Sequence, residues 1–426
     1  MLDIAALCLV VTAVFAYLNL RLAALPTTIG VMAAAFALSL GLLGLGHLGV
    51  AEDVRAFQHR VVGAIDFSSV LMQGMLSFLL FAGAMQVDLP TLRRFQGTVA
   101  LLSVAGTALS TLMLGALLAW ALPRVGVAIA PAWCFVFGAL ISPTDPVAVM
   151  AIVRTAGAPK DLEQVIAGES LFNDGVGIVA FVVLLGLLPA QGPDAAAAAA
   201  AATPTAAGVG RLLLQQAGGG LALGAALGWA TSRAVRSIDR AEVAVLLTLA
   251  AVTGGYALAD HLGASGPLAM VVAGLLVGHA QRQAGREHDP VEVFWHLVDE
   301  ILNAVLFMLV GLEASVLAGG TWHAGAVVLA IAATLGVRWL TAGLPVALAT
   351  ALQRERARLP RGAGTVLTWG GLRGGISIAM ALSLPAGPER DVLLSMTYAV
   401  VVFAILVQGL TIGRVVRACV GARPGA

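Results

Sequence analysis

Long runs of apolar residues, separated by short polar stretches, dominate the chain. A helix that crosses a membrane needs about 20 mostly apolar residues, and runs of that length recur along the whole sequence. The pattern predicts about thirteen transmembrane helices, near residues 4–20, 24–46, 70–87, 97–122, 130–153, 164–189, 208–232, 242–260, 264–280, 294–318, 322–350, 363–386 and 391–418. The predicted fold class is therefore an all-α polytopic membrane protein.

Three further stretches complete this organisation. Residues 4–20 lack a basic segment before them, so we interpret them as the first membrane helix and not as a signal peptide. The segment 50–66 is too charged to span and is expected to be a loop or an interfacial helix. Residues 190–207 are rich in Ala and are expected to link two spans. No stretch is long enough for a soluble domain, so residues 1–426 form one membrane-embedded unit.

Composition and charge agree with this picture. Only 11% of the residues are charged, against about 25% in a soluble domain, which excludes a water-soluble enzyme. The formal net charge of +1 gives no basic excess for binding nucleic acid. We therefore expect the lipid bilayer as a partner and no nucleic acid. The chain has no Walker A sequence, which argues against a pump driven by ATP hydrolysis.

Basic loop residues predict the orientation, because Lys and Arg collect in cytoplasmic loops. With thirteen spans, most of the basic loop residues fall on the same side of the membrane as the C-terminus. The opposite side holds only Arg55, Arg60, Arg124, Arg211 and Arg390. We expect a multi-pass protein of the cell (inner) membrane, with the N-terminus outside and the C-terminus cytoplasmic.

Two spans carry sequences that interrupt a helix. The fifth contains Ser142-Pro143-Thr144-Asp145-Pro146, and two prolines three residues apart remove backbone hydrogen bonds. The twelfth contains glycines on both sides of Arg373, at 370–375. Interrupted spans in corresponding halves are typical of secondary transporters with inverted repeats, whose binding site lies where the two breaks cross. The simpler alternatives are a proline kink with a capping Asp145 and a purely structural Arg373.

The sixth span carries the polar sequence Gly168-Glu169-Ser170-Leu171-Phe172-Asn173-Asp174-Gly175. Glu169 and Asn173, like Ser170 and Asp174, are spaced i, i+4 and share a helix wall. Charged groups at membrane depth are costly and usually functional. A buried carboxylate among oxygen atoms can bind a proton or a metal cation but not both, which is what a cation/proton exchanger requires. A structural polar network is the alternative.

Weaker signals come from the tenth and eleventh spans. Glu300 and Asn303 share a helix face and are candidates for lining a cytoplasmic funnel, although ordinary interfacial residues would look the same. Arg338 lies in the middle of a span, and Glu313 is a candidate partner for it.

Together these motifs resemble the monovalent cation:proton antiporters, in the NhaP/NHE sodium/proton exchanger branch. The resemblance covers nearly the whole chain, including the sequence FWHLVDEILNAVLFMLVGLE at 294–313. It implies a homodimer with about thirteen helices per protomer, inverted repeats and two discontinuous crossing helices, the NhaA/NhaP-like antiporter fold. It also implies core transport helices within about 70–189 and 294–418 in part, and dimerisation or scaffold helices within about 1–46 and 208–280 in part.

The resemblance also assigns site residues. Asp174 matches the ion-binding aspartate, and Asn173 matches the neighbour that marks the electroneutral branch. Asp174, Ser170 and Thr144 are the expected ligands of the transported Na⁺, with Glu169 close by and Asp145 at the crossing. Arg373 matches a core arginine that pairs with an acidic residue of the Glu169 type. The third span departs from some relatives, because it has no acidic residue until Asp88.

These inferences predict a transporter, not an enzyme, with no cofactor beyond the transported Na⁺ or Li⁺ and H⁺. We expect electroneutral 1:1 exchange by alternating access, with Asp174 holding either the cation or the proton and with pH homeostasis as the role. Exchange of K⁺ for H⁺, or mixed selectivity, is the alternative within the class. A gated channel is disfavoured because no repeated filter sequence occurs. An intramembrane enzyme is disfavoured because Ser170 has no His or Lys partner in its span.

Overall fold

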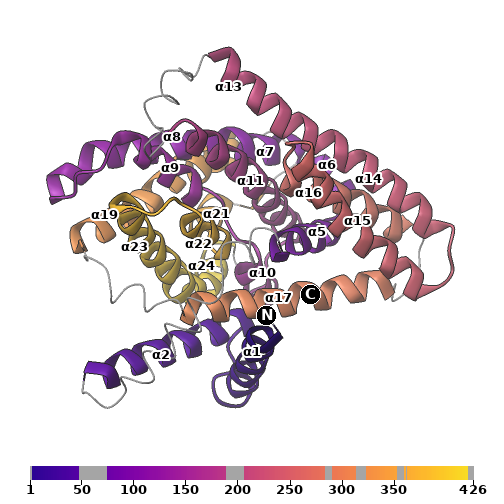
Figure 1. Cartoon of the computed structure of the whole chain (residues 1–426), viewed down its shortest axis with the longest axis horizontal. Helices are drawn as coiled ribbons and strands as arrows, with labels where there is room; N and C mark the ends of the chain where they lie inside the picture. Colours follow the sequence, from indigo (N-terminus) through magenta and orange to yellow (C-terminus); the bar gives the residue numbers. More distant parts are fainter. Residues whose placement is uncertain are drawn as a thin grey trace.

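Every ordered element in the described part of the chain is a helix (Figure 1). The computed structural model describes residues 2–47, 74–188, 206–283, 290–312, 323–352, 359–360 and 362–420. The predicted all-α class is confirmed. The predicted loop at 50–66, most of the linker at 190–207 and the candidate partner Glu313 lie outside the described residues.

Each span predicted in the first half coincides with helical residues. The helices are α1 (Leu2–Leu22), α2 (Thr27–His47), α5 (Leu76–Gln86), α6 (Leu89–Arg94), α7 (Gln96–Ala100), η2 (Leu101–Gly106), α8 (Thr107–Ala121), η3 (Leu122–Val125), α9 (Pro131–Ile141), α10 (Val147–Thr155) and α11 (Lys160–Gly186). The segment η2 is π-helical and joins α7 to α8 without a break.

The second half follows the predicted spans in the same way. Its helices are α13 (Ala206–Leu213), η4 (Leu214–Gly218), α14 (Gly219–Arg236), α15 (Ala241–His261), α16 (Gly266–Gln283), α17 (Pro290–Leu312), α19 (Ala324–Arg338), η6 (Trp339–Gly343), α20 (Leu344–Leu352), α21 (Ala363–Trp369), α22 (Gly375–Leu382), α23 (Pro388–Phe403), η7 (Ala404–Gly409) and α24 (Leu410–Val420). The segments η4, η6 and η7 are π-helical.

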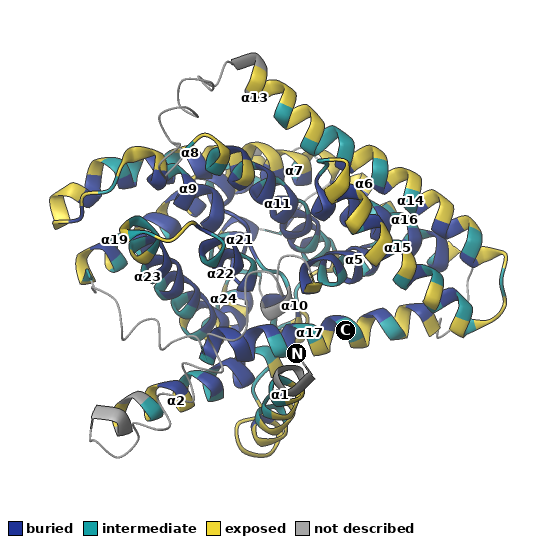
Figure 2. Cartoon of the chain, in the orientation of Figure 1, coloured by how far each residue is buried: buried dark blue, intermediate teal, exposed yellow. Residues whose placement is uncertain are grey.

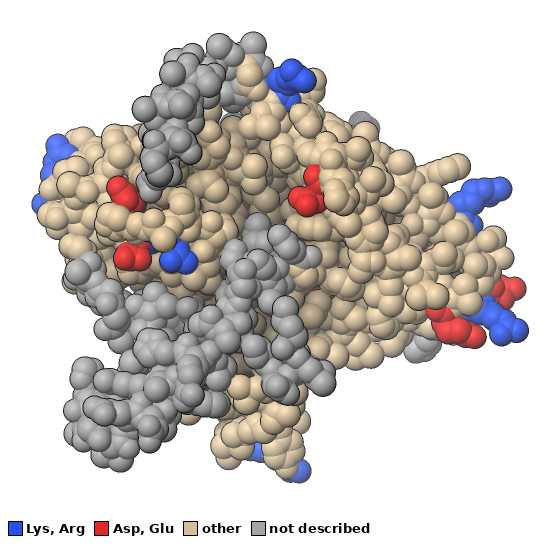
Figure 3. Space-filling view, in the orientation of Figure 1, with Lys and Arg blue, Asp and Glu red and all other residues tan. Residues whose placement is uncertain are grey.

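Length and composition fit membrane crossing. Within the described residues, six continuous helical runs are long and apolar enough to span, and α1 and α2 meet at a bend of 109°. Figure 2 shows that the outward faces of many helices are exposed. Large apolar residues are among the exposed ones, including Leu20, Leu214, Trp229, Leu246 and Val328. The described residues on the face in Figure 3 are mostly uncharged, with Lys, Arg, Asp and Glu at scattered points. Such a surface suits contact with lipid.

The helices pack in two groups. In one, α16 packs against α14 and α5, while α17 packs against α2 and α5. In the other, α8 and α11 pack against α9, and α19 packs against α8 and α23. In Figure 1 the first group runs from the right side along the lower edge, and the second fills the left and centre. Helix α11 also contacts α16, so it lies between the groups.

Both predicted interruptions are present. Residues 142–146 separate α9 from α10, and residues 370–374 separate α21 from α22. Pro146 lacks the N–H that would bond to Ser142 O in a helix, which explains the first break. The two breaks bring non-helical backbone to the centre of the second group, and this arrangement positions the candidate site.

Candidate functional site

The two broken helices meet through their backbones. The N–H of Asp145 donates to Leu372 O at 2.8 Å. The Asp145 side chain lies against Gly374, where an added Cβ would collide with its Cβ and carboxylate, so a larger residue would require Asp145 to move. Gly374 immediately precedes α22, and a negative charge is favourable at a helix N-terminus. The position predicted for Asp145, at the crossing, is the position it has.

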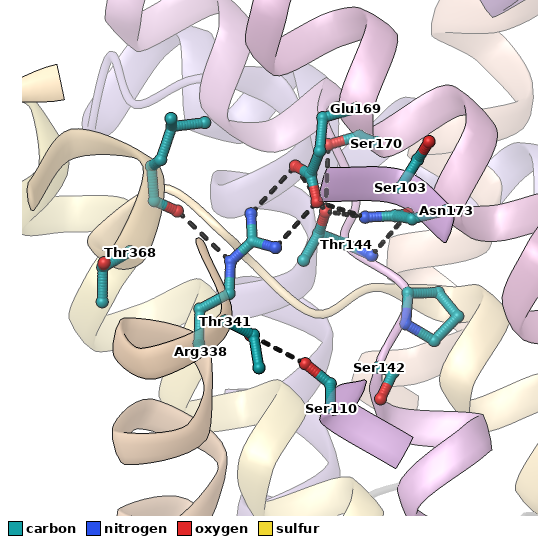
Figure 4. A network of polar contacts seen from close by, with 12 residues as sticks. Ser103, Ser110, Ser142, Thr144, Glu169, Ser170, Asn173, Arg338, Thr341 and Thr368 are labelled. Carbon is teal, nitrogen blue, oxygen red and sulfur yellow. Dashed lines mark hydrogen bonds and ion pairs between the residues drawn. The ribbon is translucent and has the colours of Figure 1, made fainter. Parts of the chain in front are cut away.

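Glu169 of α11 is held by a buried arginine (Figure 4). Arg338 Nη1 and Nη2 donate to Glu169 Oε1 and Oε2 at 2.7 and 2.9 Å. Arg338 Nε donates to Leu367 O at 3.3 Å. Both side chains are almost inaccessible, at 7% and 1% exposure. A bidentate pair of this kind is strong and geometrically specific, so Glu169 is an ionised, fixed member of the core.

Asn173 connects this pair to the unwound segment. Its Nδ2 donates to Glu169 Oε1 at 2.8 Å and to Thr144 Oγ1 at 2.7 Å. Its Oδ1 accepts from Thr144 N at 3.1 Å, and the Thr144 and Ser170 hydroxyls lie 3.0 Å apart. The i, i+4 contact predicted between Glu169 and Asn173 is thus formed. The network satisfies a backbone N–H that the broken helix leaves open.

The predicted ion pair between Arg373 and Glu169 is wrong. Arg373 Nη1 instead donates to Ser142 O and, at 2.7 Å, to Pro143 O. The cause lies in the first break: Pro146 supplies no N–H to Ser142 O, so this carbonyl needs another donor. Arg373 emerges from the opposite break and supplies it, while Arg338 occupies Glu169. The structural alternative considered for Arg373, a group that holds helix-end carbonyls, describes its contacts.

Sequence reasoning missed the partner of Arg338. Glu169 and Arg338 are 169 positions apart, and a lone arginine within a span does not indicate which acid it faces. A local requirement supports the contact, because a Cβ on Gly371 would lie 2.6 Å from Arg338 Nε. The glycines of the second break therefore make room for this arginine.

Asp174 follows Asn173 on α11 and behaves differently. Its side chain is 5% exposed. Among the described residues it has no side-chain hydrogen bond or ion pair, while Asp145, Glu169 and Arg373 are near enough to interact electrostatically. No group of three His, Cys, Asp or Glu side chains in that part of the chain could hold a resident metal ion. The carboxylate is thus available for a proton or a monovalent cation.

A cavity of about 360 Å³ extends from the molecular surface towards the residues around Asp174. Pro146 and Leu171 line it, and Leu171 is one helical turn from Asp174. Glu300 and Asn303 both line it as well, as does Asp299. Asp299 is held by Gln86, whose Nε2 donates to Oδ2 at 2.9 Å, and by Asn303, whose Nδ2 donates to Oδ1 at 2.9 Å. No pattern in the sequence had indicated Gln86.

Comparison with known proteins identifies relatives along the whole chain. A family model described as "Sodium/hydrogen exchanger, transmembrane" matches residues 10–418. The chain is 44% identical to the Na(+)/H(+) antiporter NhaP of Pseudomonas aeruginosa over 428 residues, covering 100% of this chain and 98% of that protein. It is 32% identical to the Na(+)/H(+) antiporter NhaH of Halobacillus dabanensis, covering 87% of each chain.

The fold matches a solved structure. The sodium proton antiporter MjNhaP1 from Methanocaldococcus jannaschii at pH 8 superposes with a TM-score of 0.74 over 98% of both chains. At 18% sequence identity this likeness concerns the fold alone. The antiporter-like fold predicted from the sequence is confirmed.

Proposed function

The chain belongs to the transmembrane sodium/hydrogen exchanger family, and on that premise we propose that it is a secondary active antiporter exchanging Na⁺ or Li⁺ for H⁺. The observation that carries the proposal is Asp174, a buried carboxylate with no hydrogen-bonding partner among the described residues, next to a network whose charges are compensated. Such a group binds a cation or a proton in turn. Exchange follows when the site faces the two sides of the membrane alternately.

The cation ligands we propose are Asp174, Ser170 and Thr144. Hard monovalent cations favour carboxylate, hydroxyl and carbonyl oxygens. The Ser170 and Thr144 hydroxyls already lie 3.0 Å apart, on the helix that carries Asp174 and on the unwound segment beside it. Glu169 and Asn173 fix Thr144 and take no direct part in carrying charge.

We propose that transport is electroneutral, one proton for one cation. Asn173 is an amide and cannot take up a proton in the working pH range. Glu169 stays ionised because Arg338 holds both of its oxygens. Only Asp174 then changes state, and its protonated and cation-bound forms carry the same charge. The predicted neutrality survives the corrected ion pair, since Arg338 now compensates Glu169 in place of Arg373.

The movement we propose divides the molecule between the two packing groups. The helices from α7 to α11 and from α19 to α24 carry all the proposed ligands and form the transport body. The helices α1, α2 and α14 to α16 form the scaffold and, as the family resemblance implies, the dimerisation surface. We assign α5 and α17 to the scaffold as well, although most of their residues fall in the ranges expected for transport helices, because α5 packs against α16 and α17 packs against α2. The cavity at Glu300 would then be the cytoplasmic entrance, with the N-terminus outside and the C-terminus in the cytoplasm.

Proteoliposomes with a pH-sensitive dye inside test the function. Adding Na⁺ or Li⁺ outside acidified liposomes should produce dye dequenching as protons leave. K⁺ added in the same way should produce a smaller signal. A K⁺ response equal to or greater than that of Na⁺ would establish the alternative, a K⁺/H⁺ or mixed antiporter. No response to any of the three ions would contradict antiport.

A potassium diffusion potential set by valinomycin tests electroneutrality. Each uncompensated charge would feel about 2.3 kcal/mol per 100 mV. We expect the steady-state Na⁺/H⁺ gradient to be independent of the imposed potential. A shift with potential would require a second titrating group, with Asp145 the first candidate to replace by Asn.

A further inference from the structure

A second, much smaller cavity lies behind the two core arginines. It offers about 10 Å³ to the centre of a water-sized sphere. Arg338, Arg373, Thr334, Thr368 and Gln408 line it, so its wall combines α19, the end of α21, the second break and η7. It is distinct from the cavity at Glu300, with which it shares no lining residue. A site for one water molecule needs about 10–15 Å³ on this measure.

Two buried polar atoms of the residues that line this cavity have no hydrogen-bonding partner within the described part of the chain. They are Thr334 Oγ1 and Arg373 Nε. Their residues are 4% and 2% exposed, so bulk water does not reach them freely. Buried polar groups are almost always paired, and an unpaired one is costly. That both residues with such an atom line the same water-sized cavity is the observation that needs an explanation.

We propose that this cavity is a binding site for one ordered water molecule that joins Arg373 to Thr334. The water accepts from Arg373 Nε–H and donates to Thr334 Oγ1. Thr368 supplies a third partner, because its hydroxyl donates to Gly364 O at 2.8 Å and keeps its lone pairs free to accept. Three partners are the usual number for a buried water.

The bound water has a structural consequence for the crossing. Arg373 Nη1 already holds Ser142 O and Pro143 O of the opposite break. A water on Nε fixes the other edge of the same guanidinium to α19, the helix that ends in Arg338. Arg373 is then joined through one solvent molecule to the helix that carries Arg338. Loss of the water would loosen the hold on the unwound segment that carries Thr144.

The replacement Thr334→Val tests the site, because the two possibilities give opposite signs. Valine has nearly the same shape as threonine and lacks the hydroxyl. If the hydroxyl were truly unpaired, its removal would raise the melting temperature, since an unpaired buried polar group is destabilising. If it binds the water, its removal leaves Arg373 Nε and the water poorly paired. We expect the melting temperature to fall by about 1–3 °C.

Matched variants and a structure complete the experiment. Thr334→Ser keeps the hydroxyl and should melt closer to the unmodified protein than Thr334→Val. Thr397→Val is the control for a buried threonine whose hydroxyl bonds within its own helix, to Leu393 O. A map that resolves ordered water should show a peak within hydrogen-bonding distance of both Arg373 Nε and Thr334 Oγ1, retained in Thr397→Val and lost in Thr334→Val. An empty cavity in that map, or a valine variant that melts at or above the parent, overturns the proposal; if the valine variant does not fold, the parent map decides.

Discussion

Glu169 and Asp174 are two buried carboxylates five positions apart on α11, and their surroundings are opposite. Glu169 accepts two hydrogen bonds from Arg338 and one from Asn173. Asp174 accepts no hydrogen bond from the described residues, although it is also buried, at only 5% exposure. One carboxylate is locked in a single charge state by its partners. The other is left without the partners that would lock it.

The difference separates a carboxylate with a structural role, Glu169, from one whose charge state can change during transport, Asp174. A buried ion pair with good geometry is weak evidence for net stability, but breaking it is strongly destabilising. A buried carboxylate without partners is costly wherever it occurs. A carboxylate in such surroundings suits a function that needs a group able to change state. The contrast therefore predicts that one residue controls activity and the other controls folding.

The largest effect is expected for Asp174→Asn. An amide cannot exchange a proton for a cation, so Na⁺-driven proton flux in proteoliposomes should fall to the level of empty liposomes. The melting temperature should stay close to that of the parent, because Asp174 has no bonds to lose. Asp161→Asn is the matched control on α11, since the ion pair that Asp161 forms in the described part of the chain is with the exposed Arg94, at 3.5 Å. Parental flux in Asp174→Asn would remove Asp174 from the site.

Breaking the ion pair of the other carboxylate, Glu169, should primarily destabilise the fold. Arg338→Met and Glu169→Gln should each lower the free energy of unfolding by about 3–5 kcal/mol, because each leaves a buried group unpaired. The double variant should lose clearly less than the sum. The same cycle with Arg373→Met and Glu169→Gln should show weaker coupling, since Arg373 bonds to carbonyls. Unfolding followed in detergent measures both cycles; stronger coupling to Arg373 would restore the pair that the sequence suggested.

The fold was largely predictable from the sequence because its determinants are local. Apolar length located the spans, and Pro143, Pro146 and the glycines around Arg373 located both breaks. The contact between Glu169 and Asn173 was equally predictable, since one helical turn brings them together. Family resemblance contributed the role of Asp174, which no residue pattern alone could distinguish from that of Glu169.

The predictions that failed depended on contacts between segments that are distant in the sequence. Two arginines lie near one glutamate, and only the three-dimensional arrangement shows that Arg338 reaches it while Arg373 faces Ser142 and Pro143. The π-helical segment η6, which begins directly after Arg338, also left no signal. Its residues have the same apolar character as those of an α-helix, so hydropathy does not reveal the wider turn. Pairing and local helix type therefore required the structure.

A smaller effect is expected at Thr144, which contacts the network around Glu169 and is a proposed cation ligand together with Asp174. Thr144→Val removes the hydroxyl that accepts from Asn173 at 2.7 Å and lies 3.0 Å from Ser170. A hydrogen bond contributes about 0.5–1.5 kcal/mol, which corresponds to a rise in the KM for Na⁺ of up to about tenfold. Thr144→Ser should retain most of the affinity. An unchanged KM in the valine variant would show that Thr144 is neither a ligand nor a support for one.

The smallest effect is expected at the mouth of the larger cavity, in Glu300→Gln. Glu300 is exposed, and its Oε1 lies 3.9 Å from Nδ1 of His296. Its charge can only raise the local concentration of cations, and salt screens such an effect within about 8–10 Å. The KM for Na⁺ should rise about twofold at low ionic strength and approach the parental value when choline chloride is added, with the maximal rate unchanged. Glu292→Gln is the control, because Glu292 is an exposed acid of the same helix that does not line the cavity. A loss of maximal rate in Glu300→Gln that salt does not relieve would mean that Glu300 titrates within the transport cycle, and Asp174 would then no longer be the only carboxylate that changes state.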